Sequence, residues 1–234
     1  MPNSNEITDK DGWLGARREL LAREKELTRL RDEVSQLRRE LPRQRIATAY
    51  RFESTTGSKS LSDLFGAHRQ LLVYHFMFGT DWDAGCPSCS FWADQFDAMI
   101  PHLAQRDSAF VVVSKAPLAK LQAFRERMGW GFEWVSSADS TFNEDFAVSF
   151  TEAEVESKDK IYNFGTMAPG REMPGASAFV RDGDDVFRTY STYSRGLDML
   201  NATYHWLDLS ALGRDEAELP WPMAWVKRHD EYGK

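Results

Sequence analysis

The sequence lacks the features that would place it in several specialised classes of protein. It has only two cysteines among 234 residues, too few for the disulfide framework of a small secreted fold. It has no run of about 18 consecutive apolar residues, which a membrane-spanning helix would need. Its first residues, MPNSNEITDK, do not form the basic and then apolar segments of a secretory signal. We therefore expect a cytoplasmic protein with no membrane partner.

The chain also lacks an excess of positive charge. Its formal net charge is −7 and its hydrophobic and charged fractions are 42% and 28%, with a pI of about 5.3. This composition is typical of a folded globular protein and gives no support to nucleic-acid binding. We expect no nucleic-acid partner.

Three segments organise the chain. Residues 1–45 are predicted to be a polar tail and an amphipathic helical arm, because leucines and a valine recur at helical spacing over residues 13–41 and Pro42 follows. Residues 46–209 are predicted to form one α/β domain, and residues 210–234 a C-terminal extension. The apolar stripe of the arm is expected to dock on its own domain or on a neighbouring subunit, which makes a homodimer possible.

Within residues 46–209, apolar runs alternate with stretches of helical periodicity. Buried strands are predicted at 71–78 and 109–116, on either side of a helix over 87–105 that is kinked at Pro101; this makes a right-handed βαβ unit. The other expected elements are a hairpin over 46–65, a helix over 117–129, a strand over 132–137, an irregular loop over 151–172, a hairpin over 176–193 and a helix over 196–209.

Both cysteines lie in Cys86-Pro87-Ser88-Cys89, where the first of these strands leads into the helix. Cysteines on the opening turn of a helix are close enough to form a disulfide. The unpaired N–H groups and partial positive charge of a helix N-terminus favour a thiolate, so we expect a lowered pKa for Cys86. Cys86 is the predicted attacking thiolate and the more buried Cys89 the resolving thiol. Pro87 suits the first helical position.

Three other interpretations of the pair stay open. It could be half of a zinc site, but no two histidines are spaced two to five residues apart to complete one. The cysteines could be small buried residues without chemistry. Cys86 could instead reduce peroxides. We expect no metal and no cofactor.

Other residues near the pair are less informative. Trp82 and Trp92 could form the walls of a site, although ordinary core packing is the better explanation in a chain with eight tryptophans. Asp81 and Asp83 could oppose thiolate formation by like-charge repulsion or relay a proton, but as loop residues they are more typical of turns. His75, on the predicted buried strand, is the only histidine candidate near the thiols.

The stretch YHFMFGTDWDAGCPSCSFWADQFD, together with SKAPLAKLQAFRERMGW, ALGRDE and RHDEY, resembles the bacterial family catalogued as domain of unknown function 899. The resemblance covers essentially the whole chain. It implies a thioredoxin-like fold, a central mixed sheet flanked by helices, and the activity of a predicted dithiol–disulfide oxidoreductase.

The resemblance also implies a substrate-binding edge. Thioredoxin-like proteins place a cis-proline opposite the dithiol, and Pro174 is the residue we assign to it, with Met173 presenting backbone groups to a substrate. Trp82, Pro87 and Ser88 are further substrate-binding candidates. The sequence departs from typical thioredoxins, which have Trp before the first cysteine and Gly-Pro between the pair. It also departs from the peroxiredoxin pattern, because Thr80 lies six residues before Cys86 rather than three.

The predicted function is exchange between this dithiol and a disulfide of a protein or small-molecule partner, with an unidentified electron donor. The alternatives are a thiol peroxidase and a non-catalytic dimeric interaction module on a thioredoxin scaffold.

Overall fold

The computed structural model describes residues 7–157, 160–165 and 168–233. The chain divides into two compact units, residues 1–42 and residues 43–234, and each is described here by itself.

The first unit is a single long helix, α1 (Lys10–Glu40). It begins before residue 13 because Asp9 caps it, accepting a hydrogen bond from the Gly12 amide at 2.8 Å. The stripe of apolar side chains is present, and about half of the surface of Leu20, Leu30 and Leu37 is exposed. The predicted helix is confirmed, whereas the pairing of two copies through it stays a prediction.

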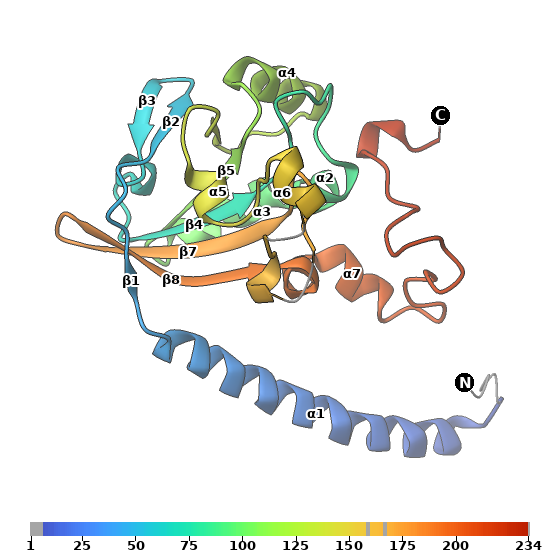
Figure 1. The fold of residues 1–234 in the computed structure, drawn as a ribbon. Coiled ribbons are helices and arrows are strands. Elements are labelled where there is room, and N and C mark those ends of the chain that lie inside the picture. The colour runs from blue at the N-terminus through green and yellow to red at the C-terminus, as the bar shows by residue number, and fades with distance from the viewer. Residues whose placement is uncertain (1–6, 158–159, 166–167, 234) are drawn as a thin grey trace. The chain divides into compact units, whose positions relative to one another are not determined.

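The second unit is built on one eight-stranded sheet with the order β1-β8-β7-β4-β5-β6-β2-β3 (Figure 1). The strands are β1 (Gln44–Arg45), β2 (Arg51–Ser54), β3 (Gly57–Ser60), β4 (Gln70–His75), β5 (Ser108–Ser114), β6 (Trp134–Ser136), β7 (Gly175–Asp182) and β8 (Asp185–Tyr193). The central strand β4 is parallel to β5 and antiparallel to β7. This mixed sheet is the predicted thioredoxin-like arrangement, with extra strands at both edges.

Helices and 3₁₀ turns connect these strands or follow the last of them. They are α2 (Pro87–Ala93), α3 (Phe96–Ala104), α4 (Leu118–Met128), α5 (Phe142–Asp145), α6 (Glu152–Ser157), α7 (Ala202–Leu207), η1 (Asp63–Phe65), η2 (Asn163–Gly165), η3 (Ser194–Leu200) and η4 (His229–Glu231). Over the described residues, no helix has both the length and the apolar character that crossing a membrane requires.

Two predicted helices are each divided, which corrects the sequence analysis. The helix expected over 87–105 is interrupted at Asp94 and Gln95, and Pro101 lies within α3. Tertiary hydrogen bonds hold this break: the Asp94 carboxylate accepts from the Trp130 indole at 2.9 Å, and the Gln95 side-chain oxygen Oε1 accepts from the Ala202 amide at 2.8 Å. The segment expected to be one helix over 196–209 is η3 followed by α7.

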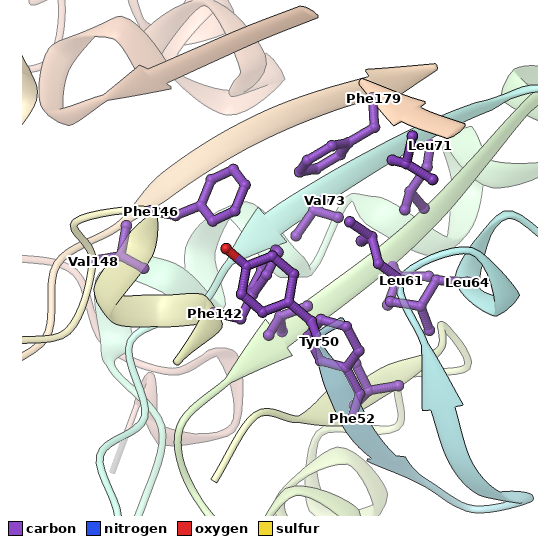
Figure 2. Close-up of a cluster of buried hydrophobic side chains, with 14 of the residues drawn as sticks. Tyr50, Phe52, Leu61, Leu64, Leu71, Val73, Phe142, Phe146, Val148 and Phe179 are labelled. Carbon is purple, nitrogen blue, oxygen red and sulfur yellow. The ribbon is translucent and has the colours of Figure 1, made fainter. Parts of the chain in front are cut away.

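The core occupies both faces of the sheet because neighbouring side chains on a strand point in opposite directions. Leu71 and Val73 of β4 belong to one cluster, which also contains Phe142 and Phe146 of the α5 region (Figure 2). Tyr74 belongs to a second cluster, formed with α2, α3 and α4, that contains Cys89. The dithiol therefore sits against the second face of the sheet.

The first cluster yields a stability prediction. Phe142 is fully buried and its ring contacts those of Tyr50, Phe52 and Phe146. Phe142→Ala should lower the free energy of unfolding by about 3–5 kcal/mol, because it removes buried apolar area and leaves a cavity. Urea denaturation measures the change. The control Leu212→Ala, at a side chain that is 79% exposed, should have little effect, and equal losses in the two variants would contradict the description of this core.

Candidate functional site around Cys86 and Cys89

The two cysteines lie 4.2 Å apart at the start of α2, and both are free thiols. Cys86 is the residue before the helix and Pro87 is its first residue, as predicted. The Cys86 amide donates to the Met77 carbonyl at 3.1 Å, and the Cys86 carbonyl accepts from the Ser90 amide at 3.0 Å. Cys86 is half-buried and only 1% of Cys89 is exposed. The predicted order of exposure is confirmed.

Gly85 explains one departure from typical thioredoxins. A Cβ atom on Gly85 would lie 2.7 Å from a ring carbon of Phe76 and 2.8 Å from one of Phe124. Both rings belong to the core cluster under α2 and cannot easily move aside. The backbone before Cys86 thus passes too close to the core for any side chain, including the tryptophan found at this place in typical thioredoxins.

The Gly85 carbonyl is held by the C-terminal extension. Arg228 donates to this oxygen from Nε at 3.0 Å and from Nη2 at 2.8 Å. Its Nη1 donates to Glu231 at 2.9 Å, and its guanidinium lies over the Phe124 ring. Figure 1 shows this segment, in red, beside α2. The peptide bond that joins Gly85 to Cys86 is therefore fixed at both its carbonyl and its N–H.

The pKa of Cys86 is lowered to about 7. The largest cause is a hydrogen bond with the Cys89 thiol; burial opposes it, and the amides of Cys89 and Ser88 and the Ser88 hydroxyl add to it. Because α2 has only seven residues, these individual donors, rather than a long helix dipole, account for the shift. The lowered pKa and the contribution of the amides that open the helix agree with the sequence analysis, which did not foresee that the Cys89 thiol is the largest cause.

The pKa of Cys89 is raised well above its ordinary value, mainly because burial disfavours its charged form, and the neighbouring Cys86 adds to the effect. Two donors oppose this rise: the Met77 amide, 3.4 Å from the Cys89 sulfur, and the hydroxyl of Tyr74. The two sulfurs thus have opposite shifts although they are adjacent. Cys86 ionises near neutral pH, whereas Cys89 remains a thiol there.

A cavity of about 780 Å³ adjoins Cys89. Its apolar floor includes Tyr74, Trp92 and Leu197, while the C-terminal extension contributes a wall. The wall residues that line it are Arg214, Asp215, Glu216, Ala217, Pro222 and Met223.

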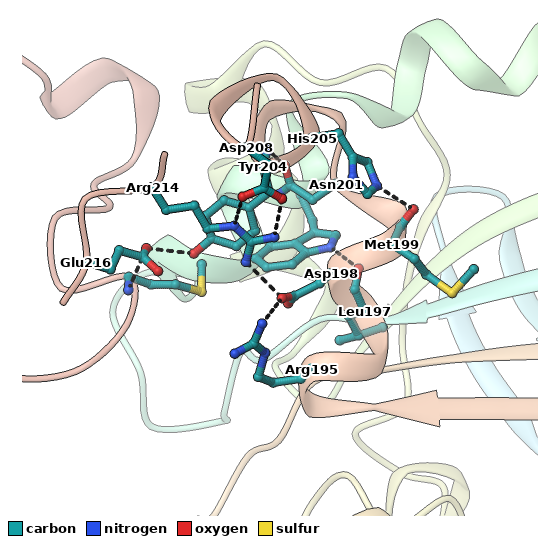
Figure 3. A network of polar contacts seen from close by, with 12 residues as sticks. Arg195, Leu197, Asp198, Met199, Asn201, Tyr204, His205, Asp208, Arg214 and Glu216 are labelled. Atoms are coloured by element: carbon teal, nitrogen blue, oxygen red, sulfur yellow. Dashed lines mark hydrogen bonds and ion pairs between the residues drawn. The ribbon is translucent and has the colours of Figure 1, made fainter. Parts of the chain in front are cut away.

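Figure 3 shows the polar contacts that hold this wall. Arg214 donates to Asp198 and Asp208 at 2.9 and 2.8 Å, and its guanidinium lies 3.8 Å from the centre of the Tyr204 ring. Glu216 accepts from the Tyr204 hydroxyl at 3.0 Å and from the Trp225 indole at 2.7 Å. Asp198, Asp208 and Glu216 are thus all hydrogen-bonded, and these contacts fix the wall in place.

The predicted substrate-binding residues separate into two groups. Ser88 and Pro174 line the cavity together with Cys89. Trp82, Pro87 and Met173 are not among its lining residues. Met173 packs against the other face of the sheet, and its amide donates to Val148 at 2.8 Å, so this N–H is not available to a substrate.

The expected cis bond before Pro174 is wrong, because no cis peptide bond occurs among the described residues. The segment leading into β7 is fixed on both sides of this bond. Met173 is tied to Val148, and the Pro174 carbonyl accepts from the Tyr162 hydroxyl at 2.5 Å. These contacts are satisfied with the ordinary trans isomer, which is favoured by about 0.5–1 kcal/mol.

His75 and Asp81 do not serve the thiols. The His75 ring faces the opposite core, stacked near Phe142, with Nε2 2.8 Å from the Ser177 hydroxyl. Burial lowers its pKa to about 3, so it stays neutral. Asp81 pairs with Arg171 at 2.8 Å. Within the described part of the chain, no cluster of three His, Cys, Asp or Glu residues could hold a metal ion.

Sequence reasoning missed three contributors to the site: the Tyr74 hydroxyl, the Met77 amide and Arg228. Strand alternation could have indicated Tyr74. It predicts that Tyr74 and Phe76 point to the same face of the sheet, and this is the face whose cluster contains Cys89. Nothing in the residues around Arg228 signals its contact with Gly85, since the two are 143 positions apart.

Comparison with known proteins identifies a family. The family described as "Bacterial protein of unknown function (DUF899)" matches residues 2–232. No curated protein matches the sequence.

Among solved structures, peroxiredoxin Q of Xanthomonas campestris is similar at 15% identity and a TM-score of 0.47, over 65% of this chain and 85% of that one. The mitochondrial 2-Cys peroxiredoxin of Plasmodium falciparum is similar at 10% identity and a TM-score of 0.46, over 72% and 95%. With likenesses this low, the reaction has to be inferred from the chain's own geometry.

The contact between Arg228 and Gly85 yields a prediction. Arg228→Ala should destabilise the protein by about 1.5–3 kcal/mol, because two charge-assisted hydrogen bonds are lost. It should also raise the pKa of Cys86, because the peptide before it is released. Urea denaturation and the pH dependence of Cys86 alkylation measure the two effects.

Arg127→Ala is the matched control. It removes ion pairs to Asp230 and Glu231 in the same segment but leaves the Gly85 contact in place. Such half-exposed pairs contribute less than about 1 kcal/mol, and the pKa of Cys86 should stay unchanged. A Cys86 pKa that responds to neither substitution would contradict the role given to Arg228.

Proposed function

We propose that this chain, which belongs to the bacterial family of unknown function DUF899, is a thiol–disulfide oxidoreductase that uses Cys86 and Cys89 as a dithiol. The observation that carries the proposal is the placement of two free thiols at the start of α2, one half-buried and the other buried. Cys86 is half-buried with a pKa of about 7, and Cys89 is buried with a raised pKa. A dithiol enzyme needs one thiolate that attacks the substrate disulfide and a second thiol that later resolves the mixed disulfide.

The first step is attack by the Cys86 thiolate on a substrate disulfide. A Cys86–substrate disulfide forms, the substrate's own sulfur–sulfur bond breaks, and the released thiolate takes a proton from solvent. In the second step Cys89 loses its proton and attacks the Cys86 sulfur. The Cys86–Cys89 disulfide forms and the second substrate thiol leaves. Two electrons pass from the dithiol to the substrate.

Completing a cycle requires an external dithiol reductant, which returns two electrons to the Cys86–Cys89 disulfide. The same steps in reverse would oxidise a partner dithiol. The substrate is thus a disulfide of a protein or a small molecule, and the cavity beside Cys89, with Ser88 and Pro174 at its edge, is where we place its nearest groups.

The stoichiometry of reaction with an aromatic disulfide, 5,5′-dithiobis(2-nitrobenzoate), tests the mechanism. The wild-type protein should release two aromatic thiols per chain and end as an unmodified chain with an internal disulfide. Cys89→Ser should release one and retain a mixed disulfide at Cys86, because nothing resolves it. Absorbance and intact mass measure both outcomes.

Two results would contradict this function. One is a wild-type product that carries two separate aromatic adducts, since the cysteines would then react independently. The other is rapid oxidation of Cys86 by hydrogen peroxide to a sulfenic acid, combined with slow reaction toward disulfides, which would favour the peroxidase alternative.

The reactivity of Cys86 should also depend on pH in a defined way. A pKa of about 7 means that alkylation by iodoacetamide rises through neutral pH and levels off above it, whereas an ordinary cysteine is only a few per cent thiolate at pH 7. In Cys89→Ala the midpoint should move upward, because the largest stabilising contact of the thiolate is lost. A midpoint at or above that of a free cysteine in the wild type would refute the activation.

A further inference from the structure

Exchange through this pair places negative charge on Cys89, the sulfur that is least able to carry it. Cys89 ionises before it resolves a mixed disulfide. It also leaves as a thiolate when a reductant attacks Cys86 in the oxidised protein. Only 1% of Cys89 is exposed, so water cannot solvate this charge well. Protein donors have to replace it.

Two donors converge on the Cys89 sulfur from the end of the central strand. The Met77 amide lies 3.4 Å from it. The Tyr74 side chain lines the same cavity as Cys89, and donation from its hydroxyl opposes the rise in the pKa of Cys89. Tyr74 is buried in the cluster that contains Cys89, and its ring is held edge-on by Phe76 and Phe96. Both donors therefore come from a rigid part of the sheet.

The usual alternative, a proton-accepting side chain beside the buried thiol, has no candidate here. Among the described residues no carboxylate or imidazole hydrogen-bonds either sulfur. His75 is turned to the other core and bonded to Ser177. The charged residues that line the cavity together with Cys89 are Arg195, Asp198, Asp208, Arg214, Asp215 and Glu216.

We propose that Tyr74 is a further catalytic residue of this site, one that stabilises the Cys89 thiolate together with the Met77 amide. This inference rests on the proposed function for its place in the cycle. Burial raises the pKa of Tyr74 well above its ordinary value, so the phenol keeps its proton and acts only as a donor. The proton that Cys89 gains or loses is exchanged with solvent in the cavity, which Tyr74 and Cys89 both line.

The Tyr74 hydroxyl would assist both the reduction of the Cys86–Cys89 disulfide and the resolution of a mixed disulfide. When a reductant thiolate attacks the Cys86 sulfur, a new disulfide forms to Cys86, and the electron pair of the broken bond goes to Cys89. The Tyr74 hydroxyl then faces a full negative charge and its hydrogen bond strengthens. During resolution the same bond lowers the cost of ionising Cys89. Both steps should slow when the hydroxyl is removed.

The test substitutes Tyr74 by phenylalanine, which keeps the ring in its aromatic cluster. In a Cys86→Ser background, the ultraviolet absorbance of the thiolate titrates Cys89 alone. Adding Tyr74→Phe should raise the pKa of Cys89 by about one unit or more, as expected for the loss of a hydrogen bond to a charged group. In the two-cysteine protein, reduction of the internal disulfide by dithiothreitol should slow about tenfold or more.

Tyr50→Phe is the matched control, because Tyr50 is a buried tyrosine of the cluster on the other face of the sheet, where its hydroxyl donates to Asp145 at 2.8 Å. It should leave the Cys89 titration and the reduction rate unchanged. A Cys89 titration unaffected by Tyr74→Phe, with circular dichroism showing an intact fold, would overturn the inference.

Failure of the proposed function is separately visible. It would appear as a wild-type protein that forms no internal disulfide with the aromatic reagent. The Cys89 titration needs no disulfide chemistry, so it tests the hydrogen bond from Tyr74 in either case.

Discussion

Stabilising a sulfur anion where water is largely excluded is the constraint on which this site depends. Each of the two thiols meets it differently. Cys86 accepts hydrogen bonds from the Cys89 thiol, from the amides that open α2 and from the Ser88 hydroxyl. Burial disfavours the thiolate form of Cys89, and the Met77 amide and the Tyr74 hydroxyl offset this effect in part. The two pKa values differ because burial is the largest influence on Cys89, whereas hydrogen-bond donors outweigh burial at Cys86.

The donors are useful only if the backbone that presents them is fixed. Two features of the chain provide this. Gly85 allows the backbone to pass against Phe76 and Phe124 at a distance that no side chain would permit. Arg228 then binds the carbonyl of the same residue from the C-terminal extension. The extension is thus part of the site: it also walls the cavity beside Cys89, where Arg214 and Glu216 are held by Asp198, Asp208 and Tyr204.

Local patterns in the sequence were sufficient for much of the fold. The apolar run at 71–78 corresponds to β4, and the turn around Gly183 joins β7 to β8 in the predicted hairpin. The placement of both cysteines at the start of a helix was also visible, because a strand, a loop and a proline mark it. These features depend on residues that are near one another in the chain.

Features that depend on distant contacts could not be predicted. The interruption of the helix after α2 is held by Trp130 and Ala202, and nothing within residues 87–105 indicates it. The trans bond before Pro174 is compatible with contacts to Val148 and Tyr162 that the sequence does not show. The contact of Arg228 with Gly85 belongs to the same class, because tertiary packing alone brings the two together.

The reduction potential of the Cys86–Cys89 pair tests the central claim most directly. The protein would be equilibrated with mixtures of reduced and oxidised dithiothreitol, and intact mass would report its state. We predict one reversible transition with a two-electron slope, between a dithiol and an internal disulfide. A protein that stays a dithiol across all mixtures, or whose cysteines form only separate mixed disulfides when glutathione mixtures are used instead, would contradict the account.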